Sequence, residues 1–97
     1  MINVIAQDKV NVYRIRYFHL KKNELTGHYH MIGSDADSHQ LVDLGVYNFY
    51  KQAIETFALM DYQDNDIMYY KTDKKVFQMP DNITDERECI RIYGNIY

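Results

Sequence analysis

The chain has little of several residue types whose presence would narrow its class. Cys89 is the one cysteine among 97 residues, so no disulfide can form within the chain, and a reducing compartment suits it. No apolar run exceeds four residues, which predicts that no helix spans a membrane. The opening MINVIAQDKV lacks the basic start and apolar centre of a signal peptide. We therefore expect a cytoplasmic protein that folds as one domain over residues 1–97.

The sequence also lacks an assembled catalytic motif. Its four glycines are scattered, so no glycine-rich loop is available to hold a phosphate. Cys89 follows Glu88, and a neighbouring carboxylate raises the pKa of a thiol, which disfavours a reactive nucleophile. These observations predict a protein that is not an enzyme and that carries no cofactor.

One long helical pattern is present, over residues 43–60. The helix could begin with Asp37 as its N-cap or later with Asp43, and Gly45 favours the later start because glycine costs about 1 kcal/mol inside a helix. Its polar side carries Asn48, Lys51, Gln52 and Glu55. Its apolar side repeats at helical spacing and consists of Val42, Val46, Phe49, Tyr50, Ala53, Phe57 and Met60.

The flanking segments alternate with a period of two, as strands do. Residues 2–20 form one long strand or two strands broken near Gln7–Asp8, and residues 10–20 mix apolar and polar side chains on both faces. Further strands are expected at residues 27–33, 67–71, 76–79 and 86–97, the last from the alternation of Ile90 and Ile92 with Cys89 and Arg91. The prediction is an α+β fold with a single antiparallel sheet, in the order β-β-α-β-β-β, and one helix packed on one face.

Charge is segregated along the chain. Residues 1–34 carry a net charge of +3, residues 35–66 a net charge of −6, and residues 67–97 are balanced. A bipolar surface favours steered association with a charged partner, and tyrosine, used ten times, is enriched at protein interfaces. The residues predicted to contact a protein partner are Asp35, Asp37, Glu55, Asp61, Asp64, Asp66, Tyr69 and Tyr93.

Direct binding of nucleic acid is the first alternative. Basic and aromatic side chains interleave in the hairpin over residues 10–32, as on sheets that stack bases and contact phosphates. The net charge of −3 argues against it, because nucleic-acid-binding domains are usually basic overall. The residues concerned are Arg14, Arg16, Tyr17, Lys21 and Lys22.

A metal site is the second alternative. His28 and His30 point to the same side of a strand, and a hairpin loop with an even number of residues would place His19 opposite His28, whereas an odd loop would not. Three imidazoles with one open position suit zinc. The acids Asp35 and Asp37 lack the glycine and glutamate of a calcium-binding EF-hand loop, so helix capping is the better account of them.

The chain resembles small accessory proteins of phages that infect AT-rich bacteria. The resemblance lies in its size, its many residues with AT-rich codons, its lack of a catalytic site and its surface of tyrosines and acids. Anti-CRISPR proteins and other inhibitors of host defence belong to that group. The resemblance implies a protein in the cytoplasm of the host bacterium that binds and blocks a host protein, for example one that handles nucleic acid. A homodimer, formed if the long first strand has a free edge, is a further expectation.

Overall fold

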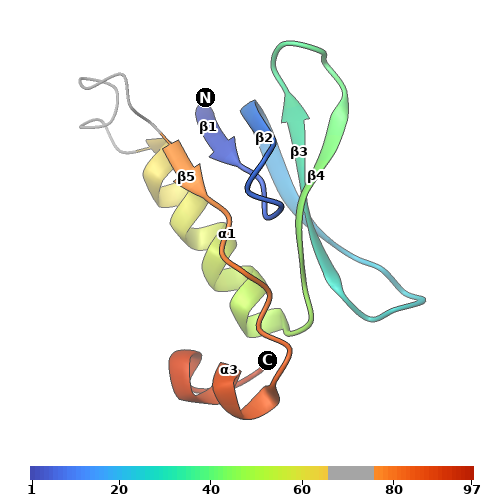
Figure 1. Cartoon of the computed structure of the whole chain (residues 1–97), viewed down its shortest axis with the longest axis vertical. Helices are drawn as coiled ribbons and strands as arrows, with labels where there is room; N and C mark the ends of the chain where they lie inside the picture. Colours follow the sequence, from blue (N-terminus) through green and yellow to red (C-terminus); the bar gives the residue numbers. More distant parts are fainter. Residues whose placement is uncertain (66–75) are drawn as a thin grey trace.

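The computed structural model describes residues 1–65 and 76–97. In these residues the chain is α+β, with one mixed sheet of five strands and two helices (Figure 1). The strands lie in the order β4-β3-β2-β1-β5. The elements are β1 (Ile2–Ile5), β2 (Val12–Lys22), β3 (Tyr29–Asp35), β4 (Leu41–Tyr47), α1 (Tyr50–Asn65), β5 (Val76–Gln78) and α3 (Glu86–Tyr93).

The expected purely antiparallel sheet is wrong, because β5 is parallel to β1. Strands β1 to β4 form an antiparallel meander, and β5 pairs with β1 in parallel, with Val4 opposite Phe77. The chain reaches β5 only after α1 has passed across the sheet, and parallel neighbours need such a crossover connection. The expected order of elements is also wrong, since three further strands, not one, follow β1 before α1.

The predicted helix over residues 43–60 is wrong in its first part, which is strand β4. Val42 and Val46 are β-branched, and Gly45 disfavours a helix, so the local preferences favour a strand. Val42 and Leu44 lie on the core side with a period of two, and a register shift opposite Met31 and Ile32 then brings Tyr47 into the core as well. Neither expected N-cap is used: α1 begins at Tyr50 and continues to Asn65.

The buried side of α1 is partly the predicted one. Ala53 and Met60 are buried against the sheet, as expected. Gln52, placed on the polar side by the sequence pattern, is 1% exposed. Its side chain accepts a hydrogen bond from the N–H of Ile83 (3.0 Å) and donates one to the carbonyl of Asp81 (2.8 Å), so it satisfies the backbone of the segment between β5 and α3.

The predicted last strand, residues 86–97, is instead helix α3. Asp85 is its N-cap, Glu86 and Glu88 lie in its first turn, and Gly94 ends it at φ 87°; each of these favours a helix. The alternation of isoleucines was misleading, because Ile90 and Ile92 are 44% and 48% exposed. The expectation of one helix therefore gives way to two in the described residues.

Residues 2–20, expected to form one long strand or two, belong to two strands, β1 and β2. The break contains Asp8, whose side chain accepts hydrogen bonds from the N–H groups of Val10 (2.9 Å) and Asn11 (3.0 Å). These bonds lower the pKa of Asp8. The expected strand over residues 67–71 lies outside the described residues, and the expected strand at 76–79 is β5.

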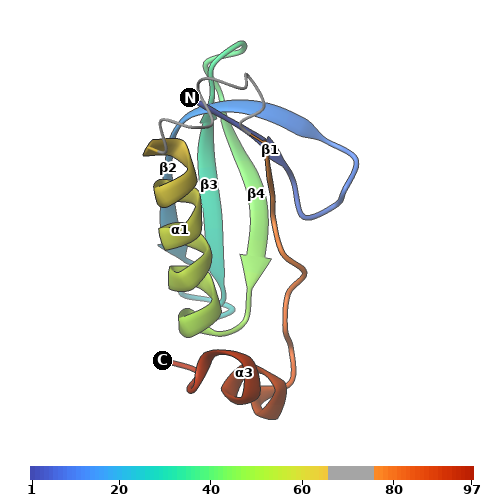
Figure 2. The same cartoon turned by 90° about the vertical axis from the view of Figure 1, so that its left-hand side faces the viewer.

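α1 covers one face of the curved sheet, whereas none of the described elements covers the other face (Figure 2). The covered face carries Ile2, Val4, Ile15, Met31 and Leu44 in one core with α1. A β-bulge between Ile15 and Tyr17 exchanges the two faces of β2, so that Ile15 and Phe18 both belong to the core side. The bulge explains why both faces of this segment mix apolar and polar residues in sequence.

The curvature brings the chain after β1 against the outer edge of β4. The N–H of Gln7 donates to the carbonyl of Leu44 (2.8 Å), and the Gln7 side chain bonds both the N–H and the carbonyl of Val46 (3.0 Å each). A Cβ at Gly45 would lie 3.3 Å from the Cβ of Gln7, so glycine permits this approach. The chain itself thereby closes the β4 edge at Leu44 and Val46.

Candidate functional site

The outer side of α1 forms the first candidate surface, called here the helix surface and defined by Glu55, Leu59, Asp61 and Tyr62. Leu59 is 57% exposed and Tyr62 is 71% exposed. Glu55 pairs with Lys51 at 2.9 Å, and Asp61 accepts a hydrogen bond from the Asn65 side chain at 3.2 Å. The last turn of α1 contains no basic residue, so Asp61 places negative charge near the negative end of the helix dipole, where it is unfavourable.

Leu59 and Tyr62 were not identified from the sequence. The prediction ended the helix at Met60, which left Tyr62 in a turn, and the apolar stripe drew attention to the buried side. A signal was available: Leu59 and Tyr62 are three residues apart, the spacing of neighbours on a helix surface. Because α1 continues to Asn65, this spacing places Leu59 and Tyr62 next to each other on the helix surface.

The remaining acids do not join this surface. Asp35 and Asp37 lie at the turn between β3 and β4, not at a helix N-terminus, so helix capping is the wrong account of them. Asp35 accepts hydrogen bonds from the Ser38 hydroxyl (2.8 Å) and the N–H of Asp37 (3.2 Å), and these bonds lower its pKa. Asp37 lies 3.9 Å from the Arg14 guanidinium. The acidic segment is thus divided between the β3–β4 turn and α1.

The last members of the predicted protein-binding set differ in their surroundings. Asp64 lies 3.4 Å from the amino group of Met1. Tyr93 is half-buried on α3, and this burial raises its pKa. Asp66 and Tyr69 lie outside the described residues.

The uncovered sheet face forms the second candidate surface. Arg14, Arg16, Tyr17 and Lys21 of β2 are all exposed, with Tyr17 at 71%. These side chains were assigned to the alternative nucleic-acid site, and the fold places them along one strand. Lys22 belongs to the other side of the strand, with its Nζ 5.9 Å from the centre of the Tyr29 ring.

The register separates the three histidines. His19 lies opposite Ile32, and His30 lies opposite Lys21, whereas His28 precedes β3. The arrangement that would place His19 opposite His28 is therefore not formed. Nδ1 of His30 is 2.7 Å from a carboxylate oxygen of Asp43 on β4. Within residues 1–65 and 76–97, no group of three or more His, Cys, Asp or Glu side chains could hold a metal ion.

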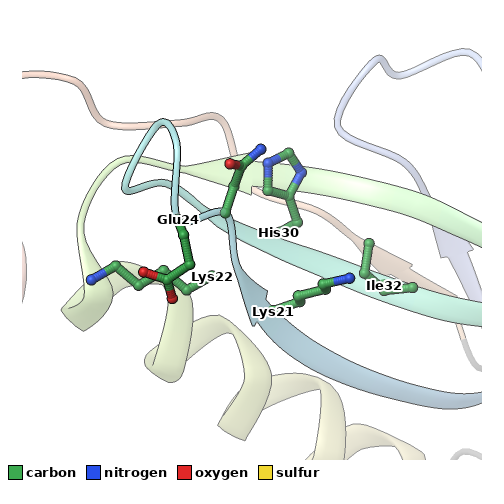
Figure 3. A pocket seen from close by; sticks show the side chains of 6 residues that line it. Lys21, Lys22, Glu24, His30 and Ile32 are labelled. Carbon is green, nitrogen blue, oxygen red and sulfur yellow. The ribbon is translucent and has the colours of Figure 1, made fainter.

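A shallow hollow of about 430 Å³ lies on this face, near the β2–β3 turn. Lys21, His30 and Ile32 rise from neighbouring strands around it, and Lys22 and Glu24 lie toward the turn (Figure 3). The hollow is open and combines cationic, acidic and apolar groups. Such a lining suits contact with a larger partner better than enclosure of a small ligand, which typically needs a deep, mostly apolar pocket.

Cys89 is buried on α3, and burial raises its pKa. Its Sγ lies 3.6 Å from the carbonyl oxygen of Asn95. A buried thiol with a raised pKa is a weak nucleophile, so the geometry gives Cys89 a packing role.

Comparison with known proteins finds no matching family model, no matching curated protein and no matching solved structure. The described residues contain no helix that is long and apolar enough to cross a membrane.

Proposed function

We propose that the protein is a small non-enzymatic module that binds another protein through the helix surface. The observation that carries this proposal is the pair of exposed apolar side chains, Leu59 and Tyr62, with the exposed Asp61 in the same stretch of α1. Exposed apolar groups rimmed by charges are typical of interaction sites, and tyrosine supplies rigid contact area at low entropic cost. Asp61 opposes the helix dipole, and residues that disfavour their own local structure are concentrated at functional sites.

The acidic rim of the helix surface favours a basic partner. Proteins that handle nucleic acid carry basic surfaces, and an acidic helix can occupy such a surface in place of a phosphate backbone. Together with the resemblance to phage inhibitors, this supports a role in blocking a host nucleic-acid-handling protein.

The test is affinity purification of the tagged protein from a nuclease-treated lysate of an AT-rich bacterium. We expect a stoichiometric protein that is retained by the wild type and lost from the double variant Asp61→Lys, Tyr62→Ala. Glu86→Lys is the matched control, because it makes the same change of charge at an exposed residue of α3, outside both candidate surfaces, and should retain the partner. Equal retention by the double variant and the control would exclude the helix surface.

Direct binding of nucleic acid is a second candidate, and one observation favours it: Tyr17, His19 and Lys21 share the uncovered face of the sheet with His30. Stacking on Tyr17 and phosphate contacts from Arg14 and Lys21 would give binding that weakens steeply with salt. A labelled oligonucleotide titrated against the wild type and against Arg14→Ala, Arg16→Ala at two salt concentrations tests it. Salt-independent binding would exclude it.

A further inference from the structure

Strand β2 has a free edge. Its residues pair with β3 from Ile15 to Lys22, but they pair with β1 only from Val12 to Ile15, because Ile2 lies opposite Ile15. From residue 16 to residue 22, therefore, no described strand lies on the β1 side of β2. We call residues 16–22 the open edge.

The backbone groups at the open edge can be assigned from the register. Asn23 donates its N–H to the carbonyl of His28, and this pair continues the β2–β3 register in which Lys21 lies opposite His30. In an antiparallel ladder, hydrogen-bonded and non-hydrogen-bonded residues alternate. Lys21 and His19 therefore bond β3, whereas Phe18 and Leu20 direct their N–H and C=O groups away from it.

These four backbone groups have no hydrogen-bond partner among the described residues. They offer two donors and two acceptors in the spacing of a strand, which is the arrangement that an added strand recognises. The opposite end of the same sheet shows the contrast, since Gln7 occupies the corresponding groups of Leu44 and Val46 on β4.

The side chains along the open edge differ on the two faces. Phe18 and Leu20 are half-buried beside the core, and the Phe18 ring lies 5.2 Å from the ring of Phe57 on α1. On the uncovered face, Arg16 and Lys21 are exposed cations. A strand added here would thus meet apolar groups with one set of alternating side chains and cations with the other.

We propose that the open edge is a docking site for an extended segment of a partner protein in which acidic and apolar residues alternate. The acidic residues complement Arg16 and Lys21, and the apolar residues extend the core beside Phe18. A second copy of this chain is a poorer occupant, because antiparallel pairing centred on His19 would place the Arg16 and Lys21 cations of both copies on one face of the shared ladder, and residues 16–22 contain no acidic side chain to balance them. The site is separate from the helix surface and does not depend on it.

The probe is a fluorescein-labelled peptide of alternating glutamate and valine, measured by fluorescence anisotropy. Two peptides serve as controls: alternating lysine and valine, and a peptide with the composition of the probe but all glutamates before all valines. We expect saturable binding of the alternating acidic peptide, with at least tenfold weaker binding of both controls. Amide hydrogen exchange should slow at Phe18 and Leu20 on binding and remain unchanged at His19, which already bonds β3.

Leu20→Pro and Leu20→Ala form a matched pair of variants. Both lose the packing of the leucine side chain, but only proline removes the outward N–H and blocks the edge with its ring, as proline does on natural edge strands. Leu20→Pro should weaken the probe at least tenfold relative to Leu20→Ala. The double variant Arg16→Glu, Lys21→Glu changes exposed side chains only, so it keeps the test available if Leu20→Pro fails to fold, and it should reverse the preference toward the lysine peptide.

Three outcomes would overturn the proposal. Equal binding of the probe to Leu20→Pro and Leu20→Ala would mean that the peptide binds elsewhere on the molecule. Binding of a single-stranded oligonucleotide but not of the peptide would assign this strand to nucleic acid. A dimer of the wild type in analytical ultracentrifugation, absent from Leu20→Pro, would assign the edge to a second copy.

Discussion

The two outer edges of the β2–β3–β4 ladder are treated differently by the fold. At β4, Gln7 bonds Leu44 and Val46, and Pro80 is held there by the hydroxyl of Tyr47 (3.0 Å) and the side chain of Gln7 (3.1 Å). At the open edge of β2, the backbone groups of Phe18 and Leu20 face away from the ladder, and no such partner is found for them in residues 1–65 and 76–97. The β4 edge is closed by polar groups of Gln7 and Pro80, from two other parts of the chain, and the open edge carries exposed cations.

This difference separates residues that maintain the fold from residues that are free to bind. A buried side chain that satisfies backbone groups cannot be replaced without leaving them unpaired, which costs about 1–3 kcal/mol for each group. Exposed charges along an edge contribute little to stability, and they discourage unspecific strand pairing. Substitutions on the closed side should therefore change stability, whereas those on the open edge should change only binding.

The largest effect is expected for Gln52→Leu on α1, because the side chain of Gln52 holds the segment that follows Pro80 through Asp81 and Ile83. It leaves the N–H of Ile83 and the carbonyl of Asp81 against an apolar side chain, so we expect the free energy of unfolding to fall by about 3 kcal/mol. Urea denaturation followed by circular dichroism measures it. The same substitution at Gln63, whose contact with the Val76 carbonyl is exposed, should cost less than about 1 kcal/mol, and equal losses would contradict the role given to Gln52.

Gln7→Leu should have the next largest effect and lower the free energy of unfolding by about 2 kcal/mol. It removes three hydrogen bonds, to Val46 and to Pro80, each worth about 1 kcal/mol, and partial exposure lets water replace some of them. Hydrogen exchange at Val46 should accelerate in this variant, because its N–H loses its acceptor. An unchanged exchange rate at Val46 would show that the β4 edge is closed in another way.

Tyr47→Phe should have a smaller effect on stability, about 1 kcal/mol, since it removes one hydrogen bond to Pro80. Burial raises the pKa of Tyr47 above its ordinary value of 10.0. The neutral side chain thus stabilises the folded state fully below pH 10.0, and this contribution is lost as the pH rises above that value and the unfolded chain ionises. Urea denaturation between about pH 9 and 11 should show a steeper loss of stability for the wild type than for Tyr47→Phe; parallel curves would contradict this.

The smallest effect on stability is expected at the open edge. Arg16→Gln and Lys21→Gln should each change the free energy of unfolding by less than about 0.5 kcal/mol, because both side chains are exposed and no ion pair depends on them in the described residues. The two variants are measured by the same urea denaturation. A loss of stability as large as that of Gln7→Leu would mean that the side chains of the open edge help to maintain the fold.

Local sequence patterns predicted part of this fold and failed at identifiable places. The spacing of apolar residues alone predicted two features: the hairpin of β2 and β3, and the buried positions of Ala53 and Met60 on α1. The segment at residues 41–47 satisfies both a helical and a strand period, and the choice between them depends on pairing with β3. In α3, the caps Asp85 and Gly94 were readable signals that the alternating isoleucines obscured.

The candidate sites were predictable only in part. The cations assigned from the sequence to a nucleic-acid site lie along β2, but the β-bulge after Ile15 determines which of them share a face, and no residue type indicates a bulge. Tyr62 was missed because the end of α1 was placed too early. The open edge depends on where β1 ends relative to β2, which is a property of the pairing and not of either segment.

By itself the sequence determined the class of the protein: an α+β chain with one cysteine, a charge division between its first and second thirds, and a short list of exposed basic and acidic side chains. Composition and local periodicity fix these properties because they depend on near neighbours in the chain. The tertiary structure alone decided that β5 runs parallel to β1, that Gln7 and Gln52 are structural, and that no described strand pairs with the β1 side of β2 beyond Ile15. Each of these depends on contacts between residues far apart in sequence, where hydrogen bonding and packing override local preference.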